Sequence, residues 1–268
     1  MKKILIILIT VLAFIVIAII IGLQVMPAPF ESIPTQSQQL DMIPLPDGLP
    51  QPVDRFYRLI YGEEIPVIDT AVLSGRARLV FNGITFPARF QFTHKAGQDY
   101  HHNIELALFG IPIMKADESY INGNSRMVLP FGTIENEPKV DQAANLGLWA
   151  ETLWFPSVFL TDARVQWEPV DATTALLHVP FEDETETFTV NFDQKTGYVR
   201  SMEVMRYKEA DSSRKTLWVN EALEWGTIDG QKILTVGSAT WMDDGKPWAT
   251  FTVEEIAYNI NIAFAIGD

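Results

Sequence analysis

A long apolar run near the middle of the chain constrains the fold most. Residues 142–160 read QAANLGLWAETLWFPSVFL and contain one charged residue, Glu151. Apolar residues recur in this run at the i, i+3, i+4, i+7 and i+8 spacing of one helical face, and Leu148 widens that face. The residues of the face are Leu146, Trp149, Ala150, Leu153 and Trp154. A helix that is apolar on most sides is buried, so the sequence predicts a central helix with a sheet wrapped around it.

The residues at the two ends of this run indicate where the helix begins and ends. We expect Asp141 or Asn145 to cap its start, because short polar side chains accept hydrogen bonds from the first free amides of a helix. We expect Pro156 to end it, since proline excludes the residue before it from the helical conformation.

The N-terminal residues predict a membrane anchor. Residues 4–25 contain no charge and, at about 1.5 Å per residue, reach roughly 33 Å, enough for the ~30 Å hydrocarbon core. A secretory signal has a shorter apolar region and small residues before its cleavage site, which Met26-Pro27-Ala28 does not match. Lys2 and Lys3 favour a cytoplasmic N-terminus. We therefore expect residues 1–25 to be an uncleaved single-pass anchor in the cell membrane, with the rest extracytoplasmic.

Composition divides the rest of the chain in two. Residues 26–52, rich in Pro, Gln and Ser, predict an extended linker, and residues 53–268 predict one β-rich domain. The part outside the membrane holds 18 basic and 34 acidic residues, a net charge of −16. That charge disfavours nucleic acid and anionic headgroups as partners. Without cysteine, disulfides, thiolate metal sites and a lipidated cysteine are excluded.

Asn82-Gly83 predicts a two-residue type I′ hairpin turn. Counting outward from it gives apolar pairs that all share one face, so the register and the hydrophobic pattern agree. These pairs are Phe81 with Ile84, Leu79 with Phe86, Ala77 with Ala88 and Leu73 with Phe92. The same register places Arg76 opposite Arg89, and like charges so placed destabilise a sheet. We expect an anionic group beside them, either a neighbouring Asp or Glu or a bound phosphate or carboxylate.

Further strands joined by short turns are predicted along the rest of the domain. Residues 98–109 form one strand, residues 111–121 and 124–131 form a hairpin, and residues 52–61 form a short helix with Phe56, Leu59 and Ile60 toward the core. Seven strands follow the central helix, at residues 163–168, 174–181, 186–192, 198–207, 215–225, 232–241 and 247–258. Strands with short connections are antiparallel, and large open sheets curl. We predict a mainly β (α+β) fold, a curled antiparallel sheet of about 11–12 strands around the central helix, preceded by one transmembrane helix.

Several segments resemble a family of bacterial membrane-anchored domains of unknown function. They are Trp149-Ala150-Glu151, Trp154-Phe155-Pro156, Trp167-Glu168-Pro169-Val170-Asp171, Gly75-Arg76-Ala77-Arg78 and residues 52–61. The likeness covers most of the domain and implies no established reaction or catalytic residue. The order helix, strands, helix, strands is also similar to the LolA/LolB type of half-barrel, which carries acyl chains under a curved sheet. This second likeness is of topology alone.

Glu151 is the most informative polar residue, because a carboxylate in an apolar helix is costly to bury unless it is paired. We expect a structural ion pair with Arg76, Arg89 or Arg126. Two alternatives are a polar anchor at the mouth of a ligand cavity and a general acid with a raised pKa.

Residues 98–109 also carry metal-ligand types. Asp99, His101 and Glu105 share one face, and His94 is near in sequence. Strand neighbours two apart lie ~6.6 Å from each other, too far for one ion without a bend, and no His-x-x-x-His or cysteine pattern is present. We interpret this as a polar solvent face and expect neither a metal nor a cofactor.

The anchor, the curled sheet and the aromatic interior together predict a function in binding. We predict a domain that binds or carries a lipid or other hydrophobic ligand on the concave face, although the seven tryptophans also suit plain core packing. The ligand-binding candidates are Glu151, Trp149, Trp154, Arg76, Arg89 and Trp167. One alternative is a scaffold or sensor domain with no cavity that binds another envelope protein. Another is a hydrolase using Glu151, Glu168 or the histidines, but no nucleophile elbow or phosphate loop supports it, and we predict no catalytic residue.

Overall fold

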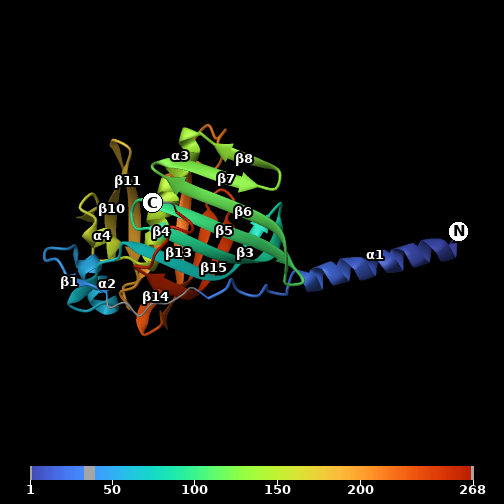
Figure 1. Ribbon diagram of the computed structural model, residues 1–268, viewed down its shortest axis with the longest axis horizontal. Helices are drawn as coiled ribbons and strands as arrows, with labels where there is room; N and C mark the ends of the chain where they lie inside the picture. Colours follow the sequence, from blue (N-terminus) through green and yellow to red (C-terminus); the bar gives the residue numbers. More distant parts are fainter. Residues whose placement is uncertain (1, 33–39, 267–268) are drawn as a thin grey trace.

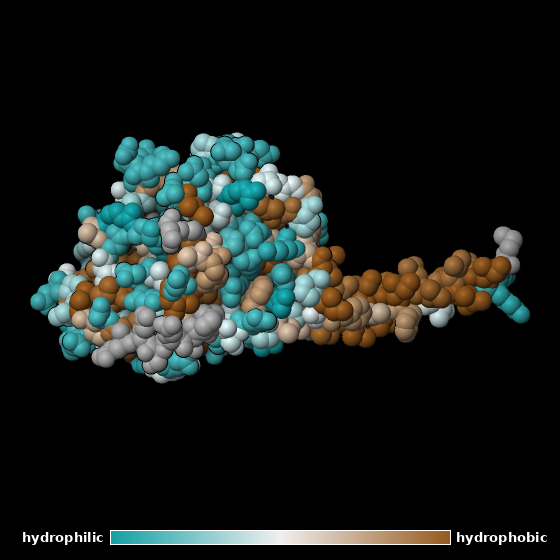
Figure 2. Space-filling view, in the orientation of Figure 1, coloured by the Kyte–Doolittle hydropathy of each residue, from teal (hydrophilic) through white to brown (hydrophobic). Residues whose placement is uncertain are grey.

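The computed structural model describes residues 2–32 and 40–266 (Figure 1). Met1 of the expected anchor, residues 33–39 of the expected linker and residues 267–268 of the expected domain lie outside the described residues. Helix α1 (Lys2–Gly22) projects away from a β-rich domain, and its surface is apolar along its length (Figure 2). By length and composition α1 is able to cross a membrane, as an anchor or as a signal sequence does.

Thirteen of the described strands form one antiparallel sheet. Its spatial order is β8-β7-β6-β5-β4-β3-β15-β14-β13-β12-β11-β10-β9. The first half holds β3 (Thr70–Phe81), β4 (Ile84–Lys95), β5 (Asp99–Leu108), β6 (Ile111–Ile121), β7 (Asn124–Leu129) and β8 (Gly132–Glu135). The second half holds β9 (Gln166–Pro169), β10 (Thr174–Phe181), β11 (Glu184–Phe192), β12 (Val199–Arg206), β13 (Thr216–Ile228), β14 (Gln231–Trp241) and β15 (Lys246–Tyr258).

The predicted mainly β fold is confirmed, and the strand count is slightly higher than predicted. The extra strand is β8, which pairs with β7 through four residues that show no apolar alternation. The two halves of the sheet meet where β15 pairs with β3, a pairing between the two ends of the domain sequence. The sheet is strongly curved and its concave side faces α3 (Figure 1).

The hairpin of β3 and β4 has the predicted register. Asn82 and Gly83 have φ angles of 49° and 76°, as a type I′ turn requires, and Phe81 pairs with Ile84. Arg76 lies opposite Arg89. Alternation along the hairpin therefore puts the apolar residues on the concave face and the two arginines on the convex face.

The central helix is α3 (Pro138–Glu151), followed by a 3₁₀ turn, η1 (Thr152–Trp154), and one short turn, α4 (Val158–Thr161). Residues 142–150 are all buried, as expected for a helix inside a curled sheet. The predicted caps are wrong, because the helix begins one turn earlier, with Pro138 in its first turn and Glu137 as a cap without a side-chain hydrogen bond. The α-helix also ends before Pro156, because the chain tightens into η1.

The two polar residues predicted as caps bind the sheet instead. Asp141 accepts hydrogen bonds from the backbone amide and the hydroxyl of Ser125, both at 2.6 Å. The side-chain amide of Asn145 donates to the carbonyl of Pro180 at 3.0 Å. These bonds fix the helix against β7 and β10, and therefore fix the position of its last residue, Glu151.

A short helix, α2 (Gln51–Ile60), covers another part of the concave side. Its buried face includes Phe56 and Tyr57, whereas Leu59, expected in the core, is half-buried. The Tyr57 hydroxyl donates to the carbonyl of Pro156 at 2.7 Å, which joins α2 to the segment after the central helix. Before α2, β1 (Met42–Pro44) pairs with β2 (Glu64–Pro66) in a small separate sheet.

Candidate functional site

A cavity of about 100 Å³ lies between the end of α3 and the concave face of the sheet. Strands β4–β6 form one wall and β12–β15 the other. Its apolar lining consists of Phe92, Ile104, Leu153, Trp154, Leu234 and Phe251. Aromatic packing holds this lining in place, because Trp154 contacts Phe92 and Phe251 with ring centroids 6.0 and 6.2 Å apart.

Small residues on both sides leave this space open. Gly147 and Ala150 of α3 face Gly237 and Ala239 of β14 across the cavity. A side chain on Gly147 would meet nothing nearer than the Arg206 guanidinium, at 4.0 Å. The cavity therefore follows directly from the residue types at these four positions.

Unpaired hydrogen-bond donors surround the polar side of the cavity. The Nε of Arg206, the indole N–H of Trp218, the side-chain amide of Asn220 and the indole N–H of Trp248 are buried and have no hydrogen-bond partner in the described residues. Leaving a buried donor unpaired costs about 1–3 kcal/mol. Four such donors around one space indicate a site for a ligand that accepts hydrogen bonds.

Arg206 supplies the positive charge of this group of donors. Its guanidinium lies over the Trp218 ring, 4.1 Å from the ring centroid, and makes no salt bridge with a carboxylate of residues 2–32 or 40–266. Burial lowers the pKa of Arg206 from its ordinary value, but an arginine remains charged at neutral pH. The cavity therefore contains a fixed cation without an ion-pair partner in the described part.

Two carboxylates of the lining already have partners. Glu118 accepts a hydrogen bond of 2.5 Å from the Tyr100 hydroxyl, and Glu221 accepts one of 3.3 Å from the Ser238 hydroxyl. These bonds hold the two acids in place along opposite walls. The donors on Arg206, Trp218 and Asn220 stay free for another acceptor.

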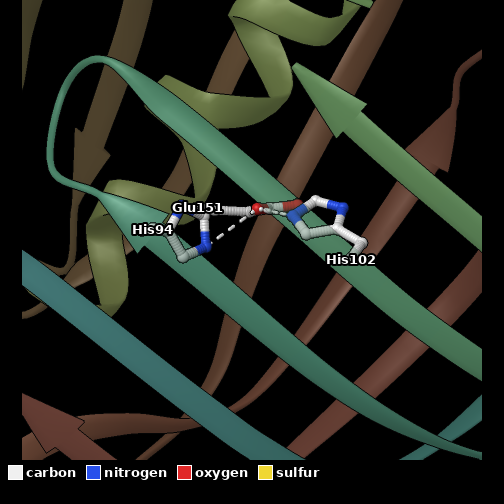
Figure 3. Close-up of side chains that lie close together, drawn as sticks. All are labelled: His94, His102 and Glu151. Carbon is white, nitrogen blue, oxygen red and sulfur yellow. Dashed lines mark ion pairs between the residues drawn. The ribbon is translucent and has the colours of Figure 1, made fainter. Parts of the chain in front are cut away.

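A second polar group is formed by His94, His102 and Glu151 (Figure 3), of which His102 and Glu151 line the cavity. Oε2 of Glu151 is 2.8 Å from Nε2 of His102 and 3.3 Å from Nε2 of His94. The two histidines come from neighbouring strands: His94 pairs with Tyr100, so His102 lies diagonally across the β4–β5 ladder. Glu151 reaches them from the last residue of α3.

Burial controls the protonation of this group. It lowers the pKa of His94 to about 3 and that of His102 to about 4, and it raises the pKa of Glu151 to about 7. Both imidazoles are therefore neutral at neutral pH, the form that binds metal ions. The donor atoms all lie within 4.8 Å of one another, and two imidazoles with one carboxylate are able to hold a zinc-type ion.

Comparison with protein families gives one assignment. A model of a family of unknown function, DUF6544, matches residues 39–253. The chain belongs to the DUF6544 family. This confirms the predicted resemblance to a domain of unknown function. No curated protein sequence matches the chain.

Three solved structures are similar to this DUF6544 chain over most of their length. A LolA superfamily protein from Nitrosomonas europaea has a TM-score of 0.47 at 10% identity, covering 78% of this chain and 93% of that one. A DUF1329 family protein from Desulfovibrio piger has a TM-score of 0.44 at 13% identity, covering 75% and 90%. A putative outer membrane lipoprotein-sorting protein domain from Vibrio parahaemolyticus has a TM-score of 0.41 at 8% identity, covering 79% and 90%.

The predicted site residues of this DUF6544 domain divide between the cavity and other places. Glu151 and Trp154 line the cavity. Trp149 packs against Phe159, and Trp167 packs against Phe159 as well, outside the cavity. Arg76 and Arg89 lie on the convex face, so four of the six candidates are away from this site.

The predicted partners of Glu151 are wrong. Arg76 pairs with Glu254, Arg89 with Glu105 and Arg126 with Glu135, at N–O distances of 2.5, 2.6 and 3.1 Å. The first two pairs confirm the expectation that neighbouring acids compensate the opposed arginines of the hairpin. All three pairs leave Glu151 with two histidines, not an arginine, as its near neighbours.

The metal-ligand types considered from the sequence do not converge. Asp99 accepts a hydrogen bond from the Asn122 amide, His101 contacts Asp117 at 3.0 Å and Glu105 pairs with Arg89. His94 instead meets His102, which strand alternation puts on the opposite face from Asp99, His101 and Glu105. The sequence did contain a signal for this contact. His94 is two residues after Phe92 and therefore shares its concave face, and the short turn at residues 95–98 brings the imidazoles of His94 and His102 to that same face.

Proposed function

We propose that this domain, held at a membrane by α1, binds a small amphiphile in the cavity beneath the sheet. The observation that carries the proposal is the group of four unpaired donors beside an aromatic lining: Arg206, Trp218, Asn220 and Trp248. A carboxylate fits these donors, because it accepts up to four hydrogen bonds and balances the guanidinium charge. The apolar part of the ligand would lie against Trp154 and Phe251.

The size of the cavity limits what it takes in this conformation. Sites for drug-sized ligands have volumes of about 300–1,000 Å³. A cavity of about 100 Å³ therefore suits a short-chain carboxylic acid, or the end of a longer chain, and not a whole lipid.

The contact between α1 and the domain supports a position at the membrane surface. The amide of Phe109 donates to the carbonyl of Gly22, the last residue of α1, at 2.9 Å. The turns after β3, β5 and β7 lie at this same edge of the sheet and expose Ile84, Phe109 and Phe131. With Lys2 and Lys3 in the cytoplasm, this apolar edge would face the outer surface of the cell membrane.

The strand register also relates the cavity to this edge. Arg206 is the last residue of β12, and its pair with Thr216 lies at the end of the sheet where β14 ends and β15 begins. This is the end at which β3 finishes. Arg206 and the turn after β3 therefore share one edge of the sheet, which supports a ligand that enters from the bilayer surface.

A titration of the full chain in detergent tests this proposal. Carboxylic acids of increasing chain length are added while the total tryptophan fluorescence, to which Trp218 and Trp248 of the cavity contribute, is followed. Alkyl alcohols and amines of equal length are the comparison ligands. We expect saturable binding of the acids and at least tenfold weaker binding of the other two classes, because hydrogen bonds to a charged group contribute about 1.5–3 kcal/mol.

Matched variants locate the binding. Arg206→Gln should weaken binding of the acid at least tenfold, whereas Arg164→Gln, which removes an arginine paired with Asp162 away from the cavity, should leave it unchanged. Equal binding of acids, alcohols and amines, or equal affinity of the acid for wild type and Arg206→Gln, would disprove the proposal that a carboxylate binds at Arg206.

The other two functions considered from the sequence fit the geometry less well. A scaffold domain requires a fully packed interior, and the interior contains a cavity. A hydrolase requires its acid and base groups to converge in one cleft. Glu151 does meet His94 and His102, but Glu168 contacts His178 at 3.0 Å, apart from the cavity.

A further inference from the structure

We propose that His94, His102 and Glu151 bind one divalent transition-metal ion of the zinc class at the wall of the cavity. The three side chains supply two imidazole nitrogens and one carboxylate oxygen. This set matches the three protein ligands of open zinc sites and of the two-histidine, one-carboxylate iron sites.

The spacing of the donor atoms fits one ion. Ligand atoms bound to one zinc at about 2.0–2.2 Å lie roughly 3.3–3.6 Å apart in tetrahedral geometry. The Glu151 oxygen lies 3.3 Å from the His94 nitrogen and 2.8 Å from the His102 nitrogen, and all three atoms lie within 4.8 Å. The Glu151–His94 separation already has the tetrahedral value, and the Glu151–His102 separation must widen by about 0.5 Å.

The contacts between these groups are close but are not hydrogen bonds. Nε2 of His102, both ring nitrogens of His94 and Oε2 of Glu151 have no hydrogen-bond partner in the described residues, although the atoms are 2.8 and 3.3 Å apart. Donors bound to one metal have this arrangement, because each lone pair points at the ion and not at the neighbouring ligand. Buried polar atoms without partners otherwise destabilise the fold.

The imidazole of His102 is held in one orientation. Its ring lies between Phe92 and Tyr100, with ring centroids 3.9 and 4.0 Å away, and is nearly parallel to the Tyr100 ring. His94 is fully buried beside Phe155, at 5.2 Å between ring centroids. Packing thus holds the two nitrogen ligands in position before the ion binds, as a high-affinity metal site requires.

The donor types also select the class of ion. Ca²⁺ and Mg²⁺ prefer sites made of oxygen ligands, whereas imidazole suits Zn²⁺, Co²⁺ and Fe²⁺. His102 and Glu151 line the cavity and His94 does not, so the remaining coordination position would face the cavity. The carboxylate of Glu151 balances only one of the two positive charges of the ion, and a ligand anion in the cavity would balance the other.

The metal alone serves as the probe, so the result does not depend on the ligand of the cavity. The full chain is purified in detergent without a polyhistidine tag, treated with chelator and dialysed. It is then titrated with Zn²⁺ by calorimetry and with Co²⁺ by absorption spectroscopy. We expect one ion per chain and a Co²⁺ ligand-field spectrum that Zn²⁺ abolishes and that excess Mg²⁺ or Ca²⁺ leaves unchanged.

Conservative variants assign the site. His94→Gln, His102→Gln and Glu151→Gln should each lower the affinity for Zn²⁺ at least tenfold, in protein whose circular dichroism shows it to be folded. His101→Gln and His178→Gln are the controls, because each removes a histidine that contacts one carboxylate at 3.0 Å outside the cavity. Both controls should bind Zn²⁺ as wild type does.

Two results would overturn the proposal. The first is the absence of saturable Zn²⁺ and Co²⁺ binding by folded wild-type protein, a measurement that needs no variant. The second is Zn²⁺ binding that persists in His102→Gln and Glu151→Gln, or that is lost in either control, since the ion would then be bound elsewhere.

Discussion

The Nε2 atom of His102 lies 2.8 Å from the carboxylate of Glu151, and this contact joins β5 to the last residue of the central helix. In the absence of a metal ion it places a largely buried carboxyl group against neutral imidazoles. Burial outweighs the attraction of His94 and Arg206 for a negative charge on Glu151, so ionisation of this side chain opposes folding.

The stability of the metal-free protein should therefore depend on pH through Glu151. Burial raises its pKa to about 7, above the ordinary value of 4.5. Because the pKa of Glu151 is higher in the folded than in the unfolded state, protonation of this side chain stabilises the fold. The contribution is fully present below the ordinary pKa and is lost as the pH rises through the pKa of the folded state. The free energy of unfolding of wild type, relative to Glu151→Gln, should thus fall between about pH 4.5 and pH 7 by up to about 3 kcal/mol. That figure is an upper bound, since 19% of the side chain is exposed.

Urea unfolding in the presence of chelator checks this dependence. Wild type and Glu151→Gln are compared at about pH 5 and pH 8, where Glu151 is mainly protonated and mainly ionised. Glu151→Gln keeps the shape of the side chain, so the comparison isolates the charge. A stability difference that is the same at both pH values would show that Glu151 does not have the raised pKa.

Gly75 should be the glycine of the sheet least able to accept a side chain. A Cβ atom there would lie 2.0 Å from the backbone carbonyl oxygen of Thr252, beside the irregular pairing of β3 with β15. Gly75→Ala must move a backbone and should destabilise the domain by roughly 1–3 kcal/mol. Gly237→Ala is the matched control in β14, where the nearest atom would be 3.5 Å away, and it should change stability by less. Equal melting temperatures of the two variants would contradict the pairing of β3 with β15.

Local features of the sequence predicted local structure well. The register of the β3–β4 hairpin followed from Asn82-Gly83, because a two-residue turn fixes which residues pair. The opposed Arg76 and Arg89 followed from that register, and so did the need for acids beside them. The identity of the acid that pairs with Arg76 could not be predicted. It is Glu254 on β15, and no turn signal predicts that β15 pairs with β3, which is far away in sequence.

The site itself was only partly predictable, for the same reason. The apolar pattern of residues 142–160 was sufficient to identify Glu151 as a largely buried carboxylate. Its neighbours depend on where the end of α3 meets the sheet, which is set by contacts such as Asn145 with Pro180. Arg206, at the far end of β12, carries no local signal that distinguishes it from a surface arginine.

Removal of residues 1–25 should release the domain from membranes. The full chain should sediment with the membrane fraction, and protease added outside the cell should digest the domain, since α1 is long enough to span and Lys2 and Lys3 favour a cytoplasmic N-terminus. Fractionation and protease accessibility measure this directly, in cells with a permeabilised outer membrane where two membranes are present. A domain that stays protected in such cells would show the opposite orientation.

Gly147→Ala should separate stability from ligand binding. Glycine inside a helix is less favourable than alanine by about 0.8–1.0 kcal/mol, and the new Cβ would meet nothing nearer than Arg206 at 4.0 Å. The variant should therefore be more stable by roughly 0.5–1 kcal/mol in the absence of ligand. The added methyl group narrows the cavity on the helix side, so carboxylic acids that bind wild type should bind the variant more weakly. Thermal unfolding and the fluorescence titration, applied to the same preparations, measure the two effects. A less stable variant would mean that the space beside Gly147 is filled, and unchanged affinity in a more stable variant would place the ligand away from α3.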